Sequence, residues 1–274
     1  MSGWTVLRDN IQTRRTPNTE VLVVEGEDDR FFIESMLDQV AHGTWPAKWT
    51  IGEAGGKQNV LKILKDQPDW IAIVDRDEWT DGDIATKQSE FPRRLHVLPR
   101  YCMESYFIFP SELWNALPAS QKNMVGSLTA LETALLSSLP EWVRHGCLWH
   151  AVNPLHDGLR AIGFKDSLLD FNNAQNDAII HQTLKDWHQF LDPKRIEADF
   201  HKNLNSAQIA TLEEKLAIWV HGKKFFEQHV AKSLHKLLRK GLKEVSTDKW
   251  LTELRKDLPV PNDLAFLWSA MGLL

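Results

Sequence analysis

The sequence predicts an α/β protein in which a parallel sheet is followed by a mostly α-helical C-terminal region. Over the first hundred residues, short apolar runs rich in Val and Ile alternate with helix-like periodicity, as a parallel sheet with crossover helices requires. After about Ser111 the strand patterns stop, and helical periodicity continues through Leu274. We therefore expect an α/β domain over residues 1–112 and a helical domain over residues 113–274.

The elements of the first half follow from the spacing of apolar residues. The expected strands are 21–24, 49–51, 71–74 and 95–98. Helices are expected over 28–40 and 58–65, where apolar residues recur at three- and four-residue spacing. The polar stretch from Trp79 to Pro92 lacks that periodicity, so we expect a loop there.

The second half shows helical patterns separated by Pro, Asn and Gly. Helices are expected near residues 120–138, 141–150, 176–190, 193–204, 207–220, 223–240, 247–257 and 262–271. Ser206 and Gly241 are suitable helix caps.

Composition indicates a soluble globular protein. The chain has 274 residues, of which 43% are hydrophobic, enough for a sizeable core. Its apolar runs are far shorter than a membrane span, and Met1-Ser2-Gly3-Trp4 has no signal-peptide pattern. Two cysteines, Cys102 and Cys147, do not make a disulfide framework. These features predict a cytoplasmic protein without membrane association.

The charge is unevenly distributed along the chain. Residues 1–112 contain 13 Lys and Arg against 19 Asp and Glu, a net charge of −6, whereas the remainder carries +1. A metal site dense in carboxylates produces such a bias, and bound divalent ions would cancel part of it. An acidic solvated surface is the alternative.

Acidic residues follow two of the expected strands. Glu25 and Asp29 come after the first strand, and Asp75 and Asp77 come after the third. The carboxyl ends of parallel strands are where open α/β sheets place their sites. In an extended segment, residues i and i+2 share a face. We therefore expect several carboxylates to converge at one edge of the sheet.

Converging carboxylates repel one another unless a cation lies between them, and a hard divalent ion with oxygen ligands is the usual solution. Such ions activate a water and stabilise a leaving oxygen in phosphoryl chemistry. The alternative is that the acids only cap a helix, because Asp near a helix N-terminus accepts free N–H groups. That alternative applies best to Asp28, which points away from Asp29 on a helix.

The motif formed by these acids resembles that of the TOPRIM domain. Its elements are an apolar strand ending in Glu25-Gly26, Asp29 four residues after the glutamate, and Asp75-x-Asp77 after a later strand. The segments Gly55-Gly56-Lys57-Gln58-Asn59-Val60 and Cys102-Met103-Glu104-Ser105-Tyr106 are similar to the branch that has a C-terminal helical region. That branch includes the nuclease subunit of PARIS-type anti-phage systems and, more distantly, the overcoming-lysogenization-defect nucleases. The resemblance covers about residues 18–110.

The resemblance implies roles for individual residues. Glu25 matches the TOPRIM glutamate, a metal ligand or general base. Asp75 and Asp77 match the metal ligands of the Asp-x-Asp motif and, with Glu25, form the implied catalytic set. Asp29 and Glu104 match further acids of the metal site. Two Mg²⁺ or Mn²⁺ ions are the implied cofactors.

The resemblance also implies a biological role. It is that of a toxic endonuclease effector of prokaryotic immunity, controlled by an ABC-type ATPase partner supplied in trans. RNA, and tRNA in particular, is the favoured substrate, with DNA as the alternative. A homodimer is expected. The rival functions are a non-catalytic regulatory or nucleic-acid-binding subunit and a housekeeping RNA-processing enzyme.

Basic residues provide candidate nucleic-acid contacts. Gly55-Gly56-Lys57 lacks the full P-loop pattern, so we interpret Lys57 as a phosphate contact at a helix N-terminus, with a simple turn as the alternative. A second group lies on the helix expected over 223–240, where a stripe of lysines either tracks phosphates or is a solvated face. The stripe consists of Lys232, Lys236 and Lys240, and Lys223 and Lys224 at the start of the same helix are further candidate contacts. An alternative for Lys223 and Lys224 is a place near the acids, where they would stabilise the charge that develops on a phosphate.

Overall fold

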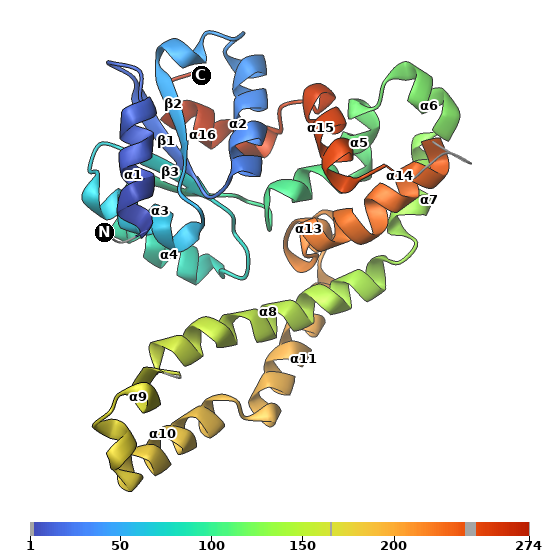
Figure 1. The fold of residues 1–274 in the computed structure, drawn as a ribbon. Coiled ribbons are helices and arrows are strands. Elements are labelled where there is room, and N and C mark those ends of the chain that lie inside the picture. The colour runs from blue at the N-terminus through green and yellow to red at the C-terminus, as the bar shows by residue number, and fades with distance from the viewer. Residues whose placement is uncertain (1–2, 165, 239–244, 274) are drawn as a thin grey trace. The chain divides into compact units, whose positions relative to one another are not determined.

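The computed structural model describes residues 3–164, 166–238 and 245–273. The chain forms two compact units (Figure 1). Unit 1 consists of Met1–Ser138 and Gly222–Leu274, and unit 2 consists of Leu139–His221. The units do not coincide with the boundary expected at residue 112, because residues 113–138 and 222–274 belong to the same compact unit as the sheet.

Unit 1 contains a four-stranded parallel sheet, which confirms the predicted α/β class. The strands are β1 (Glu20–Val24), β2 (Trp49–Glu53), β3 (Ile71–Val74) and β4 (Leu95–Val97). Their order is β2-β1-β3-β4. After β1 the chain forms β2, which pairs with one edge of β1. It then crosses to form β3, which pairs with the opposite edge of β1. The order therefore reverses between β1 and β3, where open α/β sheets bind their ligands.

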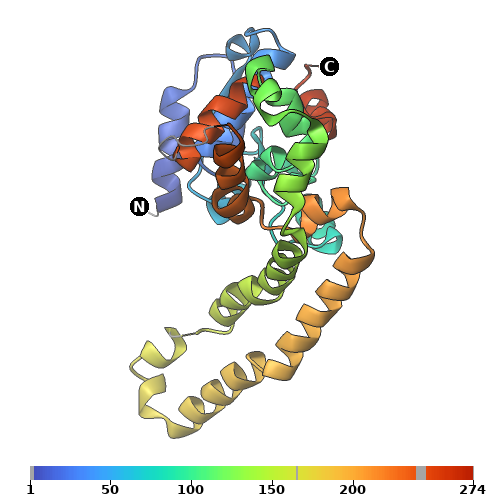
Figure 2. The ribbon, with the colours of Figure 1, turned by 90° about the vertical axis from the view of Figure 1, so that its right-hand side faces the viewer.

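Helices cover both faces of this sheet (Figures 1 and 2). On one face, Val21, Val23 and Val74 join a buried cluster with Ile11 and Val60. This face is covered by α1 (Gly3–Arg14), α3 (Lys57–Asp66) and α4 (Asp81–Glu90). The other face is covered by α2 (Glu27–Val40) and α16 (Ala265–Ala270).

Helix α4 corrects the loop expected over 79–92. This helix has no buried residue, so it lacks the apolar period by which helices are recognised. Its start is fixed by a capping box in which the Thr80 hydroxyl and the Asp83 carboxylate each accept the other's backbone N–H. Helix α1 was also unexpected, because Ile11 is its only buried residue.

The rest of unit 1 is helical. It comprises η1 (Trp45–Ala47), η2 (Met103–Phe107), α5 (Pro110–Ala116), α6 (Ala119–Val125), α7 (Leu128–Leu136), α13 (Gly222–Phe225), the π-helical η5 (Phe226–Val230), α14 (Ala231–Leu238), α15 (Thr247–Asp257) and η6 (Asn262–Leu264). The single helix expected over 120–138 is two, because Gly126 adopts φ +92° and ends α6. The helix expected over 223–240 includes the η5 segment, and the cap expected at Gly241 lies outside the described residues.

The C-terminal segment of unit 1 returns to the sheet domain. The Ser35 hydroxyl donates to the carbonyl of Arg255 at 2.9 Å, and the Trp49 indole donates to the carbonyl of Met271 at 3.2 Å. Arg100, just after β4, is paired with Glu112 of α5 and Asp263 of η6. Residues far apart in sequence thus complete one unit.

Unit 2 is entirely helical in its described residues. It comprises α8 (Leu139–Ala161), α9 (Asp166–Leu169), η3 (Asn173–Gln175), α10 (Asp177–Phe190), α11 (Pro193–Ile209), α12 (Leu212–Glu214) and the π-helical η4 (Lys215–Trp219). Helix α11 packs along α8, and α9 and α10 connect them (Figure 2). Ser206 lies inside α11 rather than capping a new helix, which corrects that expectation. Among the described helices of the chain, none is long and apolar enough to cross a bilayer.

Candidate functional site

Two of the predicted acids meet at the carboxyl ends of the central strands. Glu25 directly follows β1 and Asp75 directly follows β3, at the point where the strand order reverses. The backbone N–H of Asp75 donates to Glu25 Oε1 at 2.9 Å. This bond holds the glutamate side chain against the end of the neighbouring strand.

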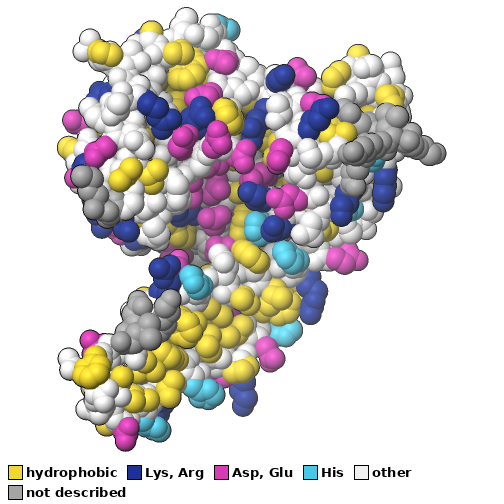
Figure 3. Space-filling model, in the orientation of Figure 1, with side chains coloured by type: hydrophobic (Ala, Val, Ile, Leu, Met, Phe, Trp, Pro, Cys, Tyr) yellow, Lys and Arg dark blue, Asp and Glu magenta, His cyan; other side chains and the backbone are white. Residues whose placement is uncertain are grey.

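Two further predicted acids lie close to this pair. Asp29, in the first turn of α2, accepts the N–H of Gly26 on Oδ2 at 2.8 Å. Glu104 lies in η2, and the N–H of the preceding Met103 donates to Asp75 Oδ1 at 3.2 Å. Acidic side chains gather on the face of unit 1 drawn in Figure 3.

Burial, together with neighbouring charges, shifts the pKa values of three of these carboxylates. Burial raises the pKa of Glu25 to about 7, although the positive charge of Lys57 opposes this shift. Burial, with the charges of Glu25 and Glu104, raises the pKa of Asp29 to about 7. Burial and the charges of four neighbouring acids raise the pKa of Asp75 well above its ordinary value. Since those neighbours are Asp29, Glu25, Asp77 and Glu104, the five predicted acids form one cluster centred on Asp75.

Asp77 is brought to the cluster together with a lysine. Its backbone is left-handed (φ +49°), a conformation that Asp tolerates better than most residues, and its N–H donates to the carbonyl of Tyr101 at 2.8 Å. The Tyr101 hydroxyl donates to Glu78, which ties down the same loop. Lys57 Nζ lies 2.6 Å from Asp77 Oδ2 and 4.0 Å from Glu25 Oε1.

A pair of glycines places Lys57 beside Glu25. Gly55 (φ +68°) and Gly56 (φ +120°) adopt backbone conformations that disfavour residues with a side chain. The N–H of Gly56 donates to the carbonyl of Glu25 at 2.9 Å, and α3 begins at the next residue. The prediction that Lys57 stands at a helix N-terminus is therefore confirmed, and its ammonium faces the acids.

One lysine of the basic stripe also reaches the cluster. Lys223 Nζ lies 3.7 Å from Glu104 Oε1, and its side chain is 50% exposed. The preceding Gly222 is buried against η2, where an added Cβ would lie 2.3 Å from Ser105 Oγ and 2.9 Å from Cys102 Sγ. The sequence singled out the segment that contains Cys102 and Ser105 but not Gly222, because this contact joins segments more than a hundred residues apart.

Gly222→Ala is expected to lower the free energy of unfolding by about 1–3 kcal/mol, because the added methyl has no room against η2. It is also expected to weaken the Lys223–Glu104 contact. Urea denaturation checks the stability. Gly82→Ala is the matched control, since its added Cβ would lie 3.7 Å from the nearest atom, and it should be neutral or stabilising by about 0.5–1 kcal/mol. An equal effect of the two substitutions would contradict the close packing at Gly222.

The other described lysines of the basic segment have different surroundings. Lys224 pairs with Glu227 at 3.2 Å. Lys232 and Lys236 are exposed on α14, and Lys240 lies outside the described residues. Asp28 pairs with Arg255 at 2.8 Å, so its carboxylate has a partner on α15 rather than in the cluster.

The donors of the cluster suit a hard cation. Carboxylate oxygens are the ligands that Mg²⁺ and Mn²⁺ prefer. As placed, however, no three acidic, His or Cys side chains of the described residues are arranged to hold a metal ion. Glu25, Asp29 and Asp75 each direct one oxygen to a backbone N–H, and Asp77 is paired with Lys57. A metal ion would have to bind the remaining oxygens.

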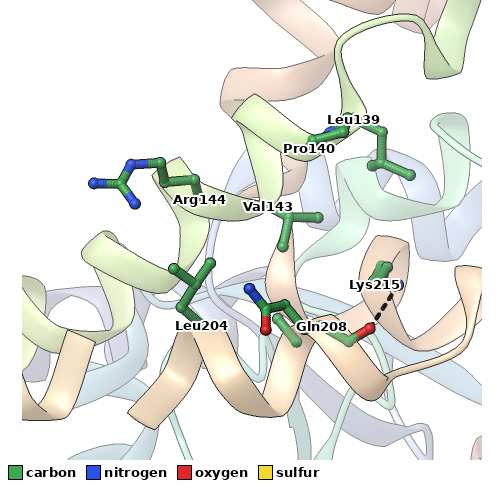
Figure 4. Close-up of a pocket in the computed structure, with 8 residues that line it drawn as sticks. Leu139, Pro140, Val143, Arg144, Leu204, Gln208 and Lys215 are labelled. Atoms are coloured by element: carbon green, nitrogen blue, oxygen red, sulfur yellow. Dashed lines mark hydrogen bonds between the residues drawn. The ribbon is translucent and has the colours of Figure 1, made fainter. Parts of the chain in front are cut away.

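Unit 2 contains a pocket of its own. An open pocket of about 410 Å³ lies between α8, α11 and η4 (Figure 4). Its lining consists of Leu139, Pro140, Val143, Arg144, Leu204, Ala207, Gln208 and Lys215. None of these eight described residues is a carboxylate, a histidine or a cysteine.

Comparison with known proteins does not assign the chain to a family, since no family model and no curated protein sequence matches it.

Proposed function

We propose that this chain is a TOPRIM-type, divalent-metal-dependent endonuclease that hydrolyses phosphodiester bonds. The observation that carries the proposal is the cluster of five carboxylates around Asp75, at the strand ends where the order of the sheet reverses. Assembling these acids costs free energy without a cation. A binding site for Mg²⁺ or Mn²⁺ accounts for that arrangement.

The resemblance gives Glu25, Asp29, Asp75, Asp77 and Glu104 as the residues that would hold the metal, and of these Asp77 is paired with Lys57 in this structure. When bound, the metal supplies an activated water and stabilises the charge on the leaving oxygen. Glu25 is suited to accept a proton at neutral pH, because its pKa is raised to about 7. Asp75 holds the backbone at Met103, next to Glu104, by accepting the Met103 N–H.

Cationic side chains would bind the substrate backbone. Lys223 is half exposed beside Glu104, so its ammonium can contact a phosphate that approaches the acids. Lys232 and Lys236 are exposed on α14 and could contact phosphates farther along a strand. Contacts of this kind are independent of sequence and sensitive to salt.

The biological role that we propose rests on the sequence resemblance. It is a cytoplasmic, toxic effector of anti-phage immunity that cleaves RNA, with tRNA favoured over DNA. An ABC-type ATPase would restrain it in trans, and the active form would be a homodimer.

Glu25→Gln tests the nuclease function. Expression of the unmodified chain without its restraining partner is expected to arrest growth and cleave tRNA, whereas Glu25→Gln should lower cleavage by at least about 10³-fold. Sequencing of cellular RNA, with DNA integrity checked in parallel, identifies the substrate. Glu27→Gln is the matched control, because the Glu27 side chain lies two residues away and is 71% exposed.

One observation favours the alternative of a non-catalytic regulatory or nucleic-acid-binding subunit. Asp77, an expected metal ligand, is paired with Lys57 in this structure. This alternative predicts that Glu25→Gln leaves any growth effect unchanged. Equal toxicity and equal cleavage in Glu25→Gln and Glu27→Gln would contradict the nuclease function.

A further inference from the structure

We propose that the ammonium of Lys57 is a permanent cation of the acidic site, so that the site binds one divalent ion rather than two. The proposal rests on the nuclease function proposed above, because it concerns how the same carboxylates are neutralised. It starts from the position of Lys57 Nζ, which lies 2.6 Å from Asp77 Oδ2 and 4.0 Å from Glu25 Oε1. Lys57 thus bridges acids that follow two different strands.

The position of Lys57 is held by its surroundings. The left-handed glycines before it direct its backbone toward Glu25, and the ring of Trp79 lies 4.4 Å from Nζ. A lysine side chain ordinarily keeps its ammonium in water. The side chain of Lys57, in contrast, is only 12% exposed. An ammonium in contact with a carboxylate and an aromatic face has replaced much of its hydration. Leaving this position would cost those contacts.

The acids on the other side of the cluster lack such a partner. Asp29 and Asp75 direct oxygens to the backbone N–H groups of Gly26 and Met103, whereas the ammonium of Lys57 lies against Asp77. Glu104 has the ammonium of Lys223, but at 3.7 Å and on a side chain that is half exposed. The unbalanced negative charge of the cluster is therefore centred on Asp75, which is where a single divalent ion would be bound.

A second divalent ion would compete with Lys57. In two-metal sites the ions lie about 3.5–4 Å apart, so a pair centred on this cluster would need the oxygens of Asp77. Lys57 already neutralises that carboxylate, and it would repel an ion placed there. Lys57 therefore supplies the charge that a second ion supplies elsewhere, and its ammonium is positioned to meet a substrate phosphate.

Counting bound Mn²⁺ tests the proposal with a readout other than catalysis. The full chain is stripped with a chelator, and bound and free Mn²⁺ are measured by electron paramagnetic resonance during titration. We expect one ion per chain in the unmodified protein and in Lys57→Arg, and two in Lys57→Met. Lys62→Met is the matched control, an exposed lysine on the same helix, and it should bind one.

The outcomes separate this proposal from the nuclease function. Two ions in the unmodified chain, or one ion in a folded Lys57→Met, would overturn the role of Lys57 and leave the nuclease function standing. No bound ion would overturn both the role of Lys57 and the metal dependence. Circular dichroism establishes whether Lys57→Met folds. If it does not, a count of two ions in the unmodified chain or in Lys57→Arg still overturns the proposal.

Discussion

Without divalent ions, the protein is expected to lose stability as the pH rises from about 4 toward 7, by roughly 3–4 kcal/mol for each of two carboxylates. The pKa of Glu25 rises from 4.5 to about 7 on folding, and that of Asp29 from 3.8 to about 7. Between those values the folded chain keeps protons that the unfolded chain has released. Stability therefore falls with rising pH across this window and levels off above it.

Urea denaturation at several pH values, in the presence of a chelator, measures this slope. Saturating Mg²⁺ should flatten it, because a bound ion stabilises the ionised carboxylates. Asp75→Asn is the informative variant, since it removes the charge at the centre of the cluster. It should show a shallower slope and higher stability at pH 8 than the unmodified chain. Stability that is constant or rises between pH 5 and 7 would refute the raised pKa values of Glu25 and Asp29.

Arg100→Ala is expected to lower the free energy of unfolding by about 2–4 kcal/mol, because it removes a buried, well-packed guanidinium and leaves two half-buried carboxylates without their cation. The Arg100 guanidinium donates to both oxygens of Glu112, each at 2.6 Å, and to Asp263 at 2.8 Å. It also lies 4.1 Å from the ring centre of Tyr106 and 4.2 Å from that of Phe109. Its side chain is only 7% exposed.

Thermal and urea denaturation check this expectation. Arg100→Lys should recover only part of the loss, because an ammonium cannot make the two parallel bonds to Glu112. Arg14→Ala is a suitable control, since Arg14 pairs with Glu53 at 3.4 Å and is 52% exposed. Exposed pairs contribute about 1 kcal/mol or less. An Arg100→Ala effect as small as that of Arg14→Ala would mean that the three-way pairing adds little to stability.

The sheet was predictable because its signals are local. Runs such as Ile71–Val74 are buried on both faces, so they read as continuous apolar segments bounded by polar residues. Helix α4 was missed because it buries no side chain, and its sequence signal is the capping box of Thr80 and Asp83. That signal is short, and it carries no information about packing.

The candidate site was predictable in part for the same reason. Glu25 and Asp75 are placed by the strands that they follow, so sequence order and parallel topology were sufficient to bring them together. The pairing of Lys57 with Asp77 was not predictable, because it depends on the direction that Gly55 and Gly56 give to the start of α3. The contact of Gly222 with η2 has no local signal at all, since it depends on how the chain returns from unit 2.

That return also sets the order in which the protein can be completed during synthesis. Unit 1 is interrupted in the sequence by unit 2, and it resumes only at Gly222. While a ribosome is still translating unit 2, the sheet and its acids have been made, but Lys223 and Asp263 have not. The acidic edge then lacks its lysine from α13, and Arg100 lacks one of its two carboxylates. Both sets of contacts can therefore form only after unit 2 has been translated and the chain has resumed unit 1 at Gly222.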